Sequence, residues 1–269
     1  MSVRIEMIII DPQLDFCDYP NKNGSLAVPG AHADMQRLAS FLKKNSFRLE
    51  DIHVTLDSHH VVDIAHPIWW IDEKFNSPAP FTLITQEMVK NGVWRSRNPA
   101  LQARSLDYVT QLEQKGRYNL CIWPEHCIIG TSGHNIHPDV MDELLNWDRQ
   151  QFASFDVVTK GSNPFTEHYS AIQAEVPDSK DSGTQLNIDL IKTLQRADVV
   201  LIAGEALSHC VANTVLDIAN NFDPNSISKL ILLEDACSNV PGFEKAGEDF
   251  INQMTKLGMR LEKTSTFNL

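Results

Sequence analysis

The alternation of short apolar runs with amphipathic segments restricts the fold of this chain more than any other feature. Six runs rich in strand-forming residues occur: MIII (7–10), DIHVTL (51–56), YNLCIW (118–123), FDVVT (155–159), DVVLIAG (198–204) and KLILLE (229–234). Helical patterns fill the intervals, at 30–44, 100–115, 137–150, 186–196, 208–221 and 243–257, and MRLEKT (259–264) is a candidate edge strand. Strands that alternate with helices predict a parallel sheet covered by helices on both faces. We therefore expect one α/β domain over 1–269.

One interval breaks this alternation. Residues 61–99 contain aromatic residues and prolines but show no regular hydrophobic period. A segment of this length inside a compact domain is usually a lid, a binding loop or an oligomer contact. Trp69 and Trp70 within it fit a lid or a subunit contact equally well.

Charge and composition restrict the partners of the chain. The formal net charge is -12 and no basic stripe is present, which argues against binding to nucleic acid or to an anionic membrane surface. The N-terminal segment MSVRIEMIIID has no leader cleavage site, and no apolar run approaches the roughly 18 residues of a membrane span. The five cysteines are scattered, so they indicate neither a disulfide framework nor a zinc-thiolate pair. We expect a cytoplasmic protein that acts on a small molecule.

Polar residues follow five consecutive predicted strands. Ligands of doubly wound sheets bind beyond the carboxyl ends of the strands, so these positions are the candidates for chemistry. The residues in question are Asp11, then Asp57 with His59, then 123–126, then Lys160, and finally 205–210.

Cys210 lies where a predicted helix begins, in SHCVANTVLDIA. Unpaired N–H groups and the helix dipole lower the pKa of a thiol at such a position and can hold an oxyanion. A cysteine there can equally pack as a small apolar residue. Asp11 and Lys160 complete an amidase set: a carboxylate can move the thiol proton to a leaving amine, and an ammonium can keep that carboxylate ionised. Each alone also fits a turn residue or a solvated charge.

A second cluster has the composition of a metal site. Asp57 and His59 are two residues apart on an extended segment and point the same way, and His126 after the next predicted strand completes an Asp/His/His set. Such a set leaves positions open for water and substrate and accepts zinc, manganese or iron. His66 is either a fourth ligand or a hydrogen-bond donor behind the ligands. Histidines of an exposed loop, without a metal, are the alternative.

Several segments taken together resemble the nicotinamidases, within the isochorismatase-like cysteine hydrolases. They occur in the family's order between residues 8 and 221: IIIDPQLDFC, NGSLAVPGA, LDSHH, WPEHCIIGT, TKG, YSA and GEALSHCVANT. The resemblance implies a three-layer α/β/α fold with a six-stranded, mainly parallel sheet, and a homo-oligomer. It also implies hydrolysis of nicotinamide to nicotinate and ammonia through a thioester on Cys210, a reaction of NAD salvage.

The resemblance further implies a role for each catalytic residue. Asp11 would be the general acid and base, Lys160 its cationic partner and Cys210 the nucleophile. A cis peptide would fall at Glu205–Ala206, and the N–H groups of Ala206 and Cys210 would hold the oxyanion.

Metal and substrate positions follow from the same resemblance. Asp57, His59 and His126 fall on the family's metal ligands, where zinc or a similar ion holds the ring nitrogen of nicotinamide. Phe16 and Trp123 match the aromatic walls of the pocket.

Three features depart from the family pattern. The segment 61–99 is long, His66 lies one residue further from Asp57 than is usual, and Glu205 stands where an apolar residue is typical. The long segment and the carboxylate could redirect the pocket to a carbamoyl or ureido compound or another small amide. A catalytically silent binding protein of the same fold is a further alternative. Glu167 and His168, which follow the Lys160 strand, are expected in a lid or on the surface.

Overall fold

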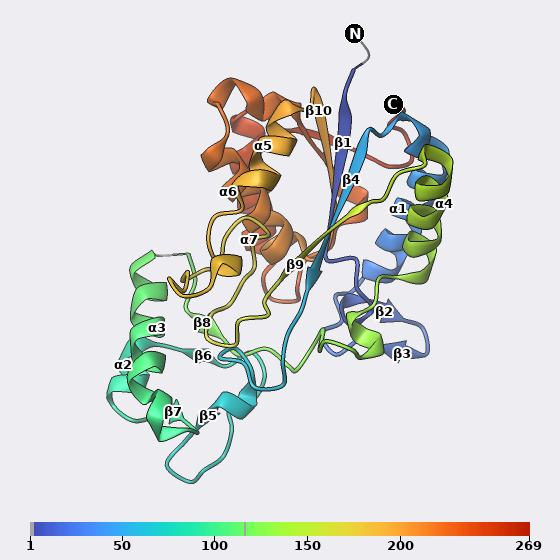
Figure 1. Cartoon of the computed structure of the whole chain (residues 1–269). Helices are drawn as coiled ribbons and strands as arrows, with labels where there is room; N and C mark the ends of the chain where they lie inside the picture. Colours follow the sequence, from blue (N-terminus) through green and yellow to red (C-terminus); the bar gives the residue numbers. More distant parts are fainter. Residues whose placement is uncertain (1–2, 116) are drawn as a thin grey trace.

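A six-stranded sheet forms the centre of the computed structural model, which describes residues 3–115 and 117–269 (Figure 1). Every pair of neighbouring strands runs parallel, in the order β12-β11-β10-β1-β4-β9. The strands are β1 (Ile5–Ile10), β4 (Asp51–Asp57), β9 (Asp156–Lys160), β10 (Val199–Gly204), β11 (Leu230–Leu233) and β12 (Arg260–Glu262). The predicted α/β class is confirmed, and β12 is the edge strand expected within 259–264.

The central strands are buried along almost their whole length and, apart from Glu6 of β1, are apolar, because both of their faces are covered. All six residues of β1 and all four residues of β11 are buried, and only the first residue of β10 is partly exposed. A strand with one solvated face would alternate polar and apolar residues instead. The runs IEMIII and VVLIAG therefore identify the middle of the sheet.

Helices cover the two faces as separate layers (Figure 1). On one face α1 (Ala31–Asn45) packs against α4 (Pro138–Gln151). The other face carries α5 (Ile188–Arg196), α6 (Ala212–Asn221) and α7 (Glu244–Lys256). These bounds lie within two residues of the helices expected from the hydrophobic period, except for the start of α6, which follows a π-helical turn over Leu207–Val211.

One predicted strand of the central sheet is wrong. Within 118–123 only Leu120–Cys121 forms a strand, β8, and it pairs antiparallel with β6 (Leu83–Ile84) outside the central sheet. The following Ile122 exchanges backbone hydrogen bonds with Phe81 and Thr82. The run is apolar because it is buried beneath the 61–99 segment, and a short apolar run does not reveal which sheet it joins.

The segment 61–99 folds together with the residues after it, beyond the carboxyl ends of the central strands (Figure 1). Besides β6, it contains η3 (Pro67–Trp69), β5 (Trp70–Ile71), α2 (Gln86–Lys90) and β7 (Arg95–Ser96), and α3 (Gln102–Lys115) packs on α2. Trp69 and Trp70 are buried inside it, where their indole N–H groups donate to Ser105 Oγ at 3.0 Å and to Ile64 O at 2.7 Å. Both tryptophans thus anchor the segment, and neither offers a subunit contact.

The part of the chain that the structure describes holds no helix with the length and apolar character needed to cross a membrane.

Gly204 at the end of β10 is expected to tolerate no side chain. Its φ is +124°, and a Cβ there would lie 1.9 Å from the carbonyl oxygen of Ile10 in β1. Gly204→Ala should therefore lower the free energy of unfolding by about 3 kcal/mol or more, measured by urea denaturation. Gly92→Ala is the matched control, because Gly92 has φ +73° with nothing within 4 Å of a Cβ and should cost only about 1 kcal/mol. Equal losses in the two variants would contradict this account of the β1–β10 contact.

Candidate active site

The polar residues singled out from the sequence meet beyond the carboxyl ends of four adjacent strands. Asp11 follows β1, Asp57 ends β4, Lys160 ends β9, and Cys210 lies in the helical turn after β10. The register of the sheet explains the meeting, because Asp57 is directly opposite Lys160 and Ile10 is directly opposite Gly204. β4 and β9 lie on one side of β1, and β10, β11 and β12 lie on the other. Open α/β sheets bind their ligands where the strand order reverses in this way.

Lys160 lies at the centre of this group. Its Nζ is 2.8 Å from Asp11 Oδ2, 3.1 Å from Asp57 Oδ1 and 3.5 Å from Cys210 Sγ. Burial alone would lower the pKa of Lys160, but Asp11 and Asp57 outweigh it and raise that pKa well above its usual value. The ammonium therefore keeps its charge and joins the two carboxylates to the thiol.

Asp11 is fixed by Thr55 of β4. Thr55 Oγ1 donates to Asp11 Oδ1 at 2.5 Å, and the Asp11 N–H donates back to Thr55 Oγ1 at 3.0 Å. The backbone of Asp11 has φ +45°, a left-handed conformation that aspartate adopts more readily than most residues. Burial raises the pKa of the Asp11 carboxyl, while the charge of Lys160 opposes this rise.

Cys210 is buried within the π-helical turn Leu207–Val211, and the peptide bond between Glu205 and Ala206 is cis. From the helix start and Lys160, the sequence predicts a lowered thiol pKa. The structure gives the opposite direction, because burial raises the pKa of Cys210 well above its usual value and outweighs Lys160. At neutral pH the thiol is therefore protonated and needs a base. Asp11, whose carboxylate also raises the pKa of the thiol, is the candidate for that base.

Asp57, His59 and His126 form a compact group with ligand atoms within 4.8 Å of one another. The Nε2 atoms of His59 and His126 lie 3.1 and 3.4 Å from Asp57 Oδ2. The opposite ring nitrogens are occupied: His59 Nδ1 lies 3.1 Å from Asp63 Oδ2, and His126 Nδ1 lies 2.8 Å from Pro124 O. Both rings therefore turn Nε2 toward Asp57, the arrangement that orients metal-binding imidazoles.

The donor set fits a divalent cation. Asp57 Oδ1 and His59 Nε2 are buried and form no hydrogen bond of regular geometry among the described residues, although they lie 3.1 Å from Lys160 Nζ and from Asp57 Oδ2, respectively. Two imidazoles and one carboxylate are the ligands that zinc and related ions bind. Gly161 lies directly behind them with φ +81°, and a Cβ there would be 2.8 Å from Asp57 Oδ1, so this position excludes a larger residue.

His66 lies beside the group but outside it. Its ring centroid is 5.2 Å from that of His59 and 5.6 Å from that of His126. Burial lowers the pKa of His66 to about 4, so the ring is neutral at physiological pH. Its Nε2 is buried without a partner among the described residues, and its role as a ligand stays a prediction.

A closed pocket joins the thiol to the candidate metal group. Its lining consists of Phe16, Leu26, Asp57, Trp123, His126, Glu167, Tyr169, Ala206, His209, Cys210 and Val240. The free volume is about 20 Å³, room for about one water molecule, so a substrate must displace lining side chains. The expected aromatic walls, Phe16 and Trp123, both line this pocket. Glu205 does not, so its carboxylate does not narrow the space for substrate.

Residues that the sequence analysis placed elsewhere or left out also belong to this pocket or support it. Glu167 and His168, expected in a lid or on the surface, are both buried, and Glu167 Oε1 lies 4.0 Å from His59 Nε2. Burial raises the pKa of Glu167 to about 7. The signal that could have indicated this residue is the spacing of Glu167 and Tyr169, which point the same way on an extended segment and both line the pocket.

Gln13 was also missed, although it belongs to the IDPQ segment. Its Nε2 donates to Asp57 O at 2.8 Å, and the Asp57 N–H donates to its Oε1 at 2.8 Å. Gln13 thus fixes the backbone that carries the candidate metal-binding carboxylate.

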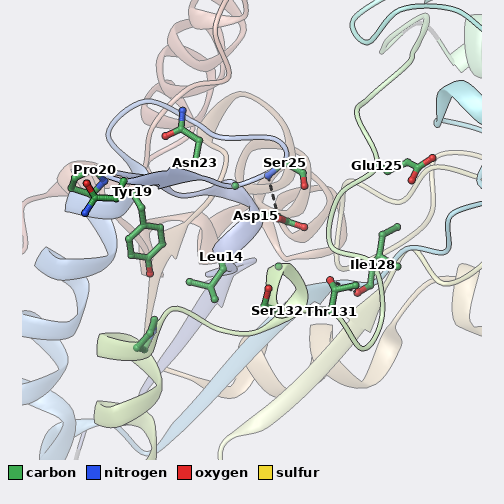
Figure 2. A pocket seen from close by; sticks show the side chains of 14 residues that line it. Leu14, Asp15, Tyr19, Pro20, Asn23, Ser25, Glu125, Ile128, Thr131 and Ser132 are labelled. Carbon is green, nitrogen blue, oxygen red and sulfur yellow. Dashed lines mark hydrogen bonds between the residues drawn. The ribbon is translucent and has the colours of Figure 1, made fainter.

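A larger hollow of about 660 Å³ lies between residues of the loop 14–25 and residues of the segment 125–138 (Figure 2). Asp15 lies at its inner wall, where its carboxylate accepts the N–H groups of Ser25 at 3.1 Å and of Cys127 at 2.7 Å. These bonds fix the neighbours in sequence, Phe16 and His126, on the pocket side. The lining of the hollow includes neither the thiol nor a metal-group residue. The reactive residues therefore belong to the smaller pocket.

Comparison with known proteins places these observations in a family context. No protein-family model matches the chain. The nicotinamidase of Escherichia coli K12 is 33% identical over 97 residues, which span 35% of this chain and 38% of that relative.

Solved structures match over nearly the whole length. A nicotinamidase/pyrazinamidase of Acinetobacter baumanii superposes with a TM-score of 0.65 at 21% identity, covering 97% of both chains. A pyrazinamidase of Pyrococcus horikoshii in complex with zinc superposes with a TM-score of 0.54 at 19% identity, covering 97% of this chain and 99% of that one. The chain therefore has the isochorismatase-like hydrolase fold and resembles the nicotinamidases in both sequence and structure.

Proposed function

We propose that this chain is a metal-assisted cysteine amidohydrolase that converts nicotinamide and water into nicotinate and ammonia. One observation carries the proposal: a single buried ammonium, Lys160, contacts Asp11 and Cys210 while the Asp57/His59/His126 group lies across the same pocket. The likeness to nicotinamidases and pyrazinamidases supports an aromatic amide as substrate.

The first half of the reaction forms the thioester. Asp11 takes the proton of the Cys210 thiol, beside Lys160, as the sulfur attacks the amide carbon, and the negative charge passes to the carbonyl oxygen. The N–H groups of Ala206 and Cys210 hold the oxyanion. Asp11 then gives its proton to the amide nitrogen, the carbon–nitrogen bond breaks, and ammonia leaves.

The second half returns the enzyme to its initial state. Asp11 takes a proton from a water molecule, whose oxygen attacks the thioester carbon. The carbon–sulfur bond breaks, and the proton on Asp11 returns to the Cys210 sulfur. The product leaves as the carboxylic acid and ionises to nicotinate by releasing its remaining proton to solvent. Lys160 again stabilises the Asp11 carboxylate and the departing sulfur, which both lie within 3.5 Å of its Nζ, while the oxyanion formed by the attack of water rests on the N–H groups of Ala206 and Cys210.

Asp57, His59 and His126 would hold the metal, with His66 as a possible further ligand. Zinc is the proposed ion, supported by the zinc complex of the Pyrococcus relative, and manganese and iron are the alternatives. When bound, the ion would supply a Lewis acid for the pyridine nitrogen. Phe16 and Trp123 would hold the ring flat, with its amide over Cys210.

The metal group also favours nicotinamide over the rival substrates. A carbamoyl or ureido compound has no ring nitrogen to bind a metal, whereas this chain devotes three buried residues to a group that fits one. Cytoplasmic location, homo-oligomerisation and a role in NAD salvage accompany the proposal as predictions.

Cys210→Ala should abolish turnover and leave the fold and the metal content intact. Ammonia release from nicotinamide should fall by about 10³-fold or more, because no other group can form the thioester. Cys121→Ala is the control, since Cys121 is equally buried but lies in β8. Assaying both variants on nicotinamide, pyrazinamide and a carbamoyl amine tests substrate and nucleophile together. Persistent activity of Cys210→Ala would refute the mechanism.

His59→Gln should reduce the bound metal of the purified protein, whereas His60→Gln should not. His59 is fully buried in the metal group, while its neighbour His60 is exposed. Elemental analysis of the two variants measures the difference directly, and activity on nicotinamide should follow the metal content. Equal metal content in both would place the ion elsewhere or exclude it.

Metal binding should release a proton. Burial lowers the pKa of His59, but Asp57 and Asp63 outweigh it and raise that pKa well above its usual value, so in the metal-free protein the His59 ring keeps its second proton to a higher pH than an ordinary histidine does. The proton competes with the metal for Nε2, so metal affinity should rise with pH through neutrality and level off above the pKa of His59. Calorimetric titration in buffers of different ionisation enthalpy counts the protons released, and a count of zero at pH 7 would contradict this assignment.

A further inference from the structure

Glu205 is a fully buried carboxyl group that the proposed mechanism does not use. It stands directly before Ala206, in the turn that carries the proposed oxyanion donors, yet it does not line the pocket. Its side chain instead meets Ser238 and Asp34 of α1, which is also buried. A burial of this kind without a cation of its own requires an explanation.

The contacts of Asp34 and Glu205 indicate which of the two carboxyl groups is ionised. Asp34 accepts from the Arg37 guanidinium and from Ser238 Oγ, so it has the donors of an ionised carboxylate. Glu205 accepts the Ser238 N–H at 3.1 Å through Oε2, while its Oε1 is buried without a hydrogen bond of regular geometry among the described residues. Burial and the neighbouring carboxyl of Asp34 both raise the pKa of Glu205. Two carboxyl groups can share a hydrogen bond only when one of them is protonated. Because Asp34 already receives two donors and Glu205 receives one, a proton shared between these two carboxyl groups belongs on Glu205.

The other groups around Glu205 give no compensation for a second negative charge. Asp18 and the thiols of Cys17 and Cys237 face it in addition to Asp34, and Arg37 is paired with Asp34. Burial, reinforced by Asp34, accordingly raises the pKa of Glu205 well above its usual value.

The same side chain ties together the two segments that form one wall of the pocket. Besides the Glu205–Ser238 bond, the Leu207 N–H donates to Ser238 O at 2.8 Å, and the Val240 N–H donates to Ser208 Oγ at 3.1 Å. The turn 205–208 is thus clamped to 238–240. Ala206 and Val240, one from each segment, both line the pocket.

We propose that Glu205 is a positioning residue: through its buried bond to Ser238 it holds the turn that carries Ala206 and Cys210 in place for the reaction. Its effect on turnover rests on the proposed function, but the clamp itself does not.

Glu205→Gln and Glu205→Val form the test pair. Glutamine keeps both an acceptor for Ser238 and a donor for Asp34, so it should retain kcat within about 2-fold, whereas valine removes both. Glu205→Val should lower kcat on nicotinamide by about 10-fold or more while KM changes by less than about 3-fold, because the displaced groups act on the transition state. Should the valine variant not fold, Glu205→Asp, which is too short for both contacts, takes its place with the same expectation.

Hydrogen exchange measured by mass spectrometry provides a readout that needs no substrate. Peptides covering 205–211 and 236–241 should exchange faster in Glu205→Val than in the unaltered protein, and at the original rate in Glu205→Gln. Unchanged exchange in the valine variant, full kcat in that variant, or a loss of kcat in the glutamine variant equal to that in valine would each overturn the inference. Faster exchange in valine with rescue by glutamine, in a protein that does not hydrolyse nicotinamide, would support the clamp and refute only the proposed substrate.

Discussion

The site depends on one ammonium group that lies between two carboxylates with almost no solvent. Lys160 is 1% exposed and contacts Asp11 and Asp57, and its third neighbour is the Cys210 thiol. Two carboxylates this close could not both stay ionised in such surroundings without the cation. Because Asp57 belongs to the metal group and Asp11 to the thiol, this cation also couples the two halves of the pocket electrostatically. A change of charge at the Asp57/His59/His126 group should therefore alter the electrostatic environment of the Cys210 thiol without direct contact between them.

The central sheet supplies the positional accuracy that this charge arrangement needs. β1, β4, β9 and β10 are adjacent and parallel, so their carboxyl ends bring four side chains together although these are far apart in the sequence. Thr55 then fixes the carboxylate and the N–H of Asp11, and Gln13 fixes the backbone from which the Asp57 carboxylate projects, each by a pair of hydrogen bonds. Rigid strands and short polar contacts thus hold the reactive side chains at fixed positions, which a flexible loop could not do.

Much of this was predictable, because parallel strands place the residues after them at one edge. The periodicity of the helices and the apolar runs of β1, β10 and β11 identified the layers, and Asp11, Asp57, Lys160 and Cys210 followed from strand ends. What sequence could not supply was tertiary context. The 118–123 run is apolar because of the segment above it, the thiol pKa is governed by burial, and Glu167 reaches the pocket only through the path of its loop. Asp34, the carboxylate beside Glu205, lies on α1, and no local sequence pattern connects the two residues.

The closed pocket has a kinetic consequence. With free space for about one water molecule, the state described here is not the state that admits an aromatic amide. A substrate of that size would be captured through an open population, and its apparent affinity would be weaker than the intrinsic one in proportion to the fraction of molecules that are open. In the proposed reaction the product would leave by the same route, so the opening equilibrium would limit product release as well as capture. Residues that govern opening, far from the thiol, would thus set the turnover rate as firmly as those that perform the chemistry.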